Sequence, residues 1–134
     1  MPVKYLLDTN ICIYIQKQKP PTVLARFRKL KPGEAAISIV TWGELLYGAE
    51  KSKQREMVLS LLNEFVLFVP VLPMAEDTGK TYGVIRTYLE SKGLPIGNND
   101  LWIAAHAKAE KLTLITNNER EFKRIPGLKV QNWV

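Results

Sequence analysis

The chain has 134 residues, with 19 lysines and arginines against 13 aspartates and glutamates, and a formal net charge of +6. This length predicts a single domain over residues 1–134. The lone cysteine excludes an intramolecular disulfide and a cysteine-type zinc site. The basic surplus favours nucleic acid or another polyanion as a partner. Because no stretch has the pattern of a membrane span or a signal peptide, we expect a cytoplasmic protein with no membrane partner.

Short apolar runs alternate with amphipathic stretches along the chain. Strands are predicted, in chain order, at residues 3–7, 35–39, 65–71, 112–116 and 128–130. Helices are predicted at residues 10–16, 22–30, 40–49, 53–65, 74–92 and 98–111, the last capped by Asn98 or Asn99. This alternation predicts an α/β domain with a central, mostly parallel sheet and right-handed connections.

Three acids fall at one edge of this predicted sheet. Asp8 directly follows the first strand, Glu44 lies in the first turn or so of the helix after the second strand, and Asp100 opens the last long helix. Thr116 and Asn118 follow the fourth strand. Ligands of open parallel sheets collect at the carboxyl ends of the strands. Carboxylates gathered there repel one another unless a cation lies among them, and Mg²⁺ or Mn²⁺ suits such oxygen ligands.

Each of these acids also has a purely structural interpretation. Asp8 with Thr9 and Asn10 is good N-cap chemistry. Glu44 has the position of a solvated helix residue, although its neighbours are mostly apolar. Asp100, near a helix N-terminus, gains about 0.3–1 kcal/mol from the helix dipole without any metal. Only the coincidence of all three acids at one edge therefore favours a functional site.

Four blocks of the sequence resemble the PIN-domain ribonucleases, and more narrowly the VapC toxins of type II toxin–antitoxin modules. The blocks are Leu6-Leu7-Asp8-Thr9-Asn10, Gly43-Glu44-Leu45, residues 95–107 and residues 116–122. The resemblance runs over residues 4–133. It implies a single three-layer α/β/α PIN domain with about five strands. It also implies a toxic endoribonuclease that depends on Mg²⁺ or Mn²⁺ and is held inactive by a VapB-type antitoxin.

The resemblance carries over residue by residue. Asp8 and Asp100 stand where the principal metal ligands of the family stand, and Glu44 stands at its third acid, so these three are the expected catalytic and metal-binding residues. Supporting roles are expected for Thr9, Asn10, Thr116, Asn118 and Glu119. Many PIN domains place a fourth aspartate where this chain has Asn118, and a neutral amide is a poorer cation ligand. The resemblance therefore leaves open whether the site binds one metal ion or two. Glu119 or Glu121 could compensate, although Glu121 is expected to fix its own segment.

The start of the chain and residues 96–107 resemble most the subgroup that cuts transfer RNA, notably initiator tRNA in the anticodon region. The family also implies a homodimer and a toxin–antitoxin hetero-oligomer. A phosphoacceptor signalling domain needs a pair of acids after the first strand, which Thr9 and Asn10 do not supply. A nucleotide-binding Rossmann enzyme needs a glycine-rich turn there. A non-catalytic nucleic-acid-binding module, with the acids as helix caps, is the remaining alternative.

Overall fold

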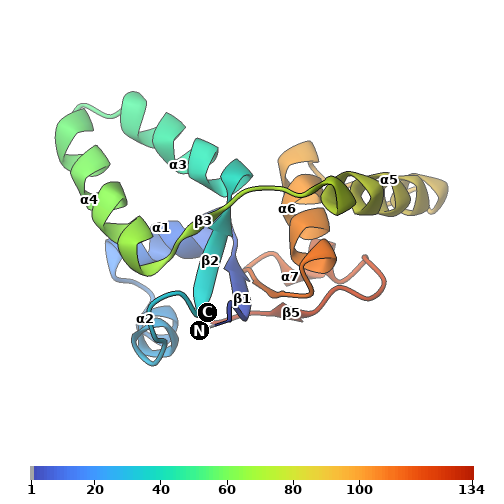
Figure 1. Ribbon diagram of the computed structural model, residues 1–134, viewed down its shortest axis with the longest axis horizontal. Coiled ribbons are helices and arrows are strands. Elements are labelled where there is room, and N and C mark those ends of the chain that lie inside the picture. The colour runs from blue at the N-terminus through green and yellow to red at the C-terminus, as the bar shows by residue number, and fades with distance from the viewer. Residues whose placement is uncertain (1) are drawn as a thin grey trace.

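The structure, a computed structural model, describes residues 2–134 as a five-stranded parallel sheet with helices on both faces (Figure 1). The strands are β1 (Tyr5–Leu7), β2 (Ala35–Ser38), β3 (Val71–Leu72), β4 (Thr113–Ile115) and β5 (Val130–Gln131). The helices are α1 (Thr9–Lys17), α2 (Pro21–Arg28), α3 (Ile39–Glu50), α4 (Arg55–Phe68), α5 (Glu76–Ser91), α6 (Asn98–Ala109) and α7 (Glu119–Phe122). Within residues 2–134, no helix is both long and apolar enough to cross a bilayer.

The central strand of the sheet is β1. The strand order is β3-β2-β1-β4-β5, so the chain first builds outward from β1 to β3 and then crosses over to add β4 and β5 on the other side. Parallel sheets form their ligand crevices at such a reversal, outside the carboxyl ends of the strands. The Asp8 amide donates to the Ile115 carbonyl at 2.9 Å, so Asp8 ends the β1–β4 ladder at this point. The topology therefore places Asp8 at the predicted edge.

Each face of the sheet carries its own apolar core. Successive side chains of a strand point to opposite faces, so Leu6 and Leu7, both fully buried, enter different cores. Leu7 packs with residues of α1, α2 and α4, including Ile11, Val23, Leu62 and Phe65. Leu6 packs with residues of α5 and α6, including Ile85, Leu89 and Ile103. Figure 1 shows these two groups of helices on opposite sides of the sheet, which confirms the three-layer architecture.

The helices and strands differ from the prediction in two main features. Residues 65–71 were expected to form a strand, but α4 continues to Phe68 and only Val71–Leu72 remains extended. A short apolar run fits both helical and strand periods. Packing decided between them, because the rings of Phe65 and Phe68 lie 6.2 Å and 5.3 Å from that of Phe27 on α2. The second feature is α7, which was not predicted because four residues are too few to show a helical period.

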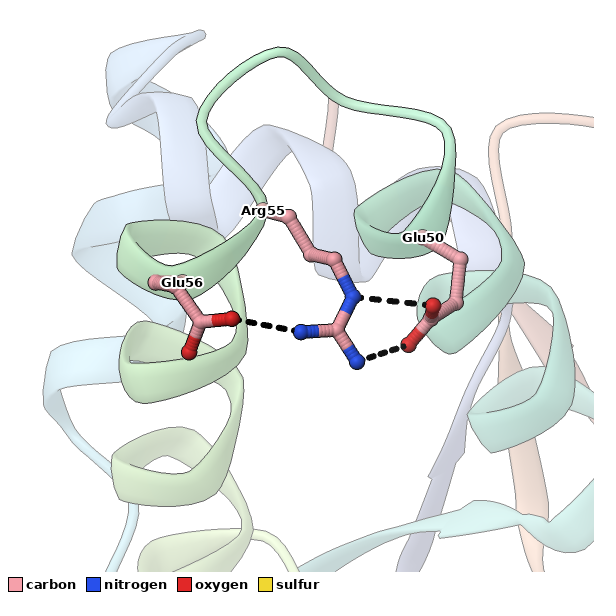
Figure 2. A network of polar contacts seen from close by, with 3 residues as sticks. All are labelled: Glu50, Arg55 and Glu56. Atoms are coloured by element: carbon pink, nitrogen blue, oxygen red, sulfur yellow. Dashed lines mark hydrogen bonds and ion pairs between the residues drawn. The ribbon is translucent and has the colours of Figure 1, made fainter.

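The turn between α3 and α4 is held by one guanidinium group (Figure 2). Arg55, the first residue of α4, donates two hydrogen bonds of 2.9 Å and 3.0 Å to the carboxylate of Glu50, the last residue of α3. Its third nitrogen contacts Glu56. The planar guanidinium matches the two carboxylate oxygens and lowers the pKa of Glu50. The pair therefore ties the end of α3 to the start of α4.

The lone cysteine and the lone histidine are core residues. Cys12 and His106 are both fully buried. Burial raises the pKa of the Cys12 thiol and lowers that of the His106 imidazole. Both groups are therefore neutral near pH 7, and neither is available as a nucleophile or a solvent-exposed base.

Candidate functional site

Asp8 lies where β1 gives way to α1. Its backbone is extended (φ −68°, ψ 158°), and its Oδ1 accepts a hydrogen bond of 2.7 Å from the Thr9 amide, so Asp8 is the N-cap of α1. Its Oδ2 accepts a second hydrogen bond of 2.7 Å from the hydroxyl of Thr116, which follows β4. The residue is only 4% exposed. Burial raises the pKa of Asp8, the two hydrogen bonds oppose that rise, and the charge of Glu44 adds to it. An N-cap needs no such burial, so capping alone does not account for Asp8.

Glu44 reaches the same place from α3. It is the sixth residue of that helix, slightly later than the sequence indicated, and it is half-buried. The hydroxyl of Thr9 donates to Glu44 Oε1 at 2.6 Å and lies 3.2 Å from the hydroxyl of Thr41. Thr9 therefore orients Glu44, while its own amide holds the neighbouring Asp8.

Asp100 comes from the start of α6, where it is the third residue and half-buried. Its pKa is raised to about 6, first by burial and then by the negative charges of Asp8, Glu44 and Glu121. The helix is not capped as predicted, because Gly97 is the N-cap and no side chain bonds the first turn. Asp100 therefore belongs to one electrostatic cluster with the two other predicted acids.

The three carboxylates form an acid cluster that a cation would complete. Within residues 2–134, the side-chain charges that act on Asp8 and Asp100 are all carboxylates. No three acidic, cysteine or histidine side chains of this described part are arranged to hold a metal ion. The Asp8 carboxylate accepts a hydrogen bond from Thr116, and that of Glu44 accepts one from Thr9. An oxygen-only donor set with uncompensated charge fits a hard divalent cation that keeps part of its water shell.

Thr116 and Asn118 support this cluster to different degrees. Thr116 is fully buried, donates to Asp8, and accepts a hydrogen bond of 2.9 Å from the Asn118 amide. The Asn118 side chain is half-buried at the N-cap position of α7 and makes no capping bond. Asn10 is exposed, and within residues 2–134 no hydrogen bond joins it to the acids. The structure therefore brings Thr116 to Asp8 but leaves Asn10 at the surface.

Of the two glutamates after β4, only Glu121 acts on the acid cluster. Glu119 bonds Lys123 at 3.2 Å and Asn132 at 3.5 Å, and Lys123 is the main reason for its lowered pKa. Glu121 instead raises the pKa of Asp100. The sequence analysis assigned a supporting role to Glu119. It could not predict the helical turn of α7, which separates the two side chains.

Sequence reasoning missed the contacts that hold the start of α6. The Tyr82 hydroxyl donates to Asn98 Oδ1 at 2.6 Å and accepts from Arg86 Nη1 at 2.8 Å. The Tyr82 ring stacks on Trp102 with 3.8 Å between centroids and 14° between planes. These residues link α5 to the helix that carries Asp100. No local pattern signals such a contact, because it joins two helices.

Comparison with known proteins agrees with this geometry. The PIN domain family model matches residues 5–128. The chain is 46% identical over 130 residues to Ribonuclease VapC2 of Rickettsia felis, covering 96% of this chain and 97% of that protein. It is 44% identical over 131 residues to the tRNA(fMet)-specific endonuclease VapC of Shigella flexneri, covering 98% of each.

Solved structures show the same likeness. The chain superposes on a chain of VapBC2 from Rickettsia felis, bound to a DNA fragment from the promoter, with a TM-score of 0.90 at 44% identity over 100% of both chains. It superposes on DNA-bound VapBC from Salmonella typhimurium with a TM-score of 0.91 at 41% identity, over 98% of this chain and 99% of that one. The sheet order and these full-length matches together show that the chain belongs to the PIN-domain family, within its group of VapC ribonucleases.

Proposed function

We propose that this chain is a toxic endoribonuclease of a toxin–antitoxin module that depends on Mg²⁺ or Mn²⁺. The observation that carries the proposal is the convergence of Asp8, Glu44 and Asp100 at the reversal of strand order. Carboxylates gathered without a counter-charge repel one another, so fold stability does not explain their position. Relatives named as VapC ribonucleases support the same activity.

In this proposal Asp8 and Asp100 hold the cation directly and Glu44 is the third catalytic acid. A bound metal ion lowers the pKa of a water and neutralises charge on a phosphodiester. Thr116 and the Thr9 amide hold Asp8 in one orientation, and the Thr9 hydroxyl does so for Glu44. The basic surplus of the chain supplies contacts to the RNA backbone.

We further propose initiator tRNA, cut in the anticodon region, as the substrate. Two similar proteins, from Shigella flexneri and Salmonella typhimurium, carry the name tRNA(fMet)-specific endonuclease VapC. The second is 41% identical over 131 residues. This similarity over nearly the whole length supports a shared substrate class.

The proposed partner is a VapB-type antitoxin, and the solved relatives include VapBC structures. Helices α1, α2 and α4 line an open groove of about 650 Å³ whose walls include Phe27, Phe65 and Phe68. We place the antitoxin in this groove. The proposed assembly is a toxin homodimer within a toxin–antitoxin hetero-oligomer, residues 1–134 acting as one domain in the cytoplasm.

The first prediction tests the activity. Purified protein should cleave initiator tRNA with Mg²⁺, spare elongator methionine tRNA, and cleave neither in chelator.

Asp8→Asn keeps the shape and the capping oxygen but removes the charge that a cation needs, so cleavage should fall by orders of magnitude. Gel analysis of end-labelled tRNA measures this, with circular dichroism as the folding control. Equal cleavage by the variant would reduce Asp8 to a helix cap. Binding without cleavage by the wild type would favour the non-catalytic module.

The second prediction concerns the cost of the acid cluster without metal. The folded pKa of Asp100, about 6, exceeds its ordinary value of 3.8, so between these values the folded state binds more protons. The free energy of unfolding should therefore fall as pH rises from about 4 to 6 and stay low above it. In chelator at pH 7.5, Asp100→Asn should be more stable than wild type by about 1 kcal/mol, after allowance for solvent screening of a half-buried group.

Urea unfolding at pH 4 and pH 7.5 measures this difference, which should shrink at pH 4 and reverse at saturating Mg²⁺. Asp77→Asn is the matched control, because Asp77 is an exposed acid in the first turn of α5. If the free energy of unfolding of Asp100→Asn showed the same pH dependence as that of this control, Asp100 would not belong to the acid cluster.

The third prediction concerns Asn118. If its neutral amide weakens a second metal site, Asn118→Asp should tighten Mg²⁺ binding or raise the number of ions bound. Isothermal titration calorimetry on wild type and variant measures both quantities. Identical affinity and stoichiometry would place Asn118 outside the metal shell.

A further inference from the structure

An open hollow of about 740 Å³ extends from the acid cluster along α3. At one end its wall includes Thr9 and Glu44, and Asn99 contributes from the start of α6. At the other end lie Tyr47 and Lys51. The hollow therefore connects Glu44, one of the candidate catalytic acids, to an aromatic ring on the same helix and to a cation at the C-cap of that helix.

The spacing along α3 places these groups in one row. Tyr47 follows Glu44 by three residues and Lys51 follows it by seven, so all three lie on one face of the helix. At 1.5 Å per residue, Lys51 lies about 10 Å along the axis from Glu44. A nucleic-acid strand whose scissile phosphate lies at the acids would pass over Tyr47 and then Lys51.

Both groups are available to a ligand. Tyr47 is 66% exposed, and the Lys51 ammonium lies 4.6 Å from its ring centroid. Glu50, the acid next to Lys51, is bound on both carboxylate oxygens by Arg55 (Figure 2). Within residues 2–134, no carboxylate lies within ion-pair distance of Lys51. Apart from its contact with the Tyr47 ring, the positive charge of Lys51 is therefore not neutralised beside the hollow.

The same face of α3 carries two glycines that packing does not explain. A Cβ atom at Gly43 or Gly48 would meet no other atom within 4 Å, and both residues border the hollow. Glycine inside a helix is less favourable than alanine, because it loses more backbone freedom on folding. These positions keep the floor of the hollow at the level of the backbone beside Glu44.

We propose that this face of α3 is a binding subsite for a single-stranded segment of the RNA substrate, flanking the cleaved bond. Tyr47 stacks on a base and Lys51 contacts a backbone phosphate. Aromatic rings and cations in an open groove are the usual elements of single-strand binding, and stacking is tolerant of base identity. The proposal rests on the proposed ribonuclease function and adds where the substrate strand lies.

The experiment measures binding of initiator tRNA in the Asp8→Asn background, so that cleavage does not intervene. Lys51→Gln should weaken binding severalfold and reduce the slope of log K against log salt by about 0.7, as expected for one lost phosphate contact on a single strand. Tyr47→Ala should weaken binding about tenfold, while Tyr47→Phe should bind like its parent, since stacking needs only the ring.

The matched controls are Lys92→Gln and Tyr88→Ala at the end of α5. This pair has the same residue types and the same spacing of four, with 5.7 Å between ammonium and ring centroid, but it lies outside the hollow. The control variants should bind as the parent does. Binding by the Tyr47 and Lys51 variants that equals that of the controls would overturn the subsite. A changed oligomeric state with unchanged RNA affinity would instead make this face a contact between copies of the chain.

A second variant separates binding from stability. Gly48→Ala should raise the melting temperature by about 2–4 °C, yet weaken RNA binding by filling the floor of the hollow. Gly83→Ala in α5, where a Cβ also meets no atom within 4 Å, should raise it similarly without affecting binding. Unchanged binding by Gly48→Ala would contradict the proposed path. Cleavage by the wild type is assayed in parallel. Its absence would refute the proposed nuclease. Cleavage by the wild type together with unchanged RNA binding by the variants would refute the subsite alone.

Discussion

The buried carboxylate of Asp8 is the constraint on which the rest of the structure depends. Burying a carboxylate is unfavourable unless hydrogen bonds or an opposite charge compensate it. Here the Thr9 amide and the Thr116 hydroxyl each supply one hydrogen bond, and Thr116 can do so only because β4 lies beside β1. The crossover that brings β4 to the central strand therefore builds the site as well as the sheet.

The proposed function makes two electrostatic demands on one small basic chain. RNA requires positive charge over the surface, whereas a divalent cation requires carboxylates gathered at one point. Asp8 is buried and Glu44 and Asp100 are half-buried, so their mutual repulsion favours a cation among them. The α3 helix then leads outward from Glu44 to Lys51, so that both signs of charge occur along one helix face.

Much of this arrangement was predictable from local sequence. An apolar strand ending in Asp8 indicates a polar group at a sheet edge, since the apolar run and its break after Leu7 are local properties. The alternation of strands and helices predicted the α/β class, and the four sequence blocks indicated the family that the comparisons show. The amphipathic stripes of the helices were equally local, because each depends on spacing within one segment.

Contacts between distant segments were not predictable in this way. The end of α4 at Phe68 depends on ring packing against Phe27, forty-one residues earlier in the chain. Glu121 acts on Asp100 through its charge, and Tyr82 donates a hydrogen bond to Asn98. Each of these interactions joins two helices. The sequence by itself thus determined the α/β class, most of the helices and strands, and the position of Asp8 after the first strand. Only the tertiary structure decided which side chains meet, because that depends on how the elements pack.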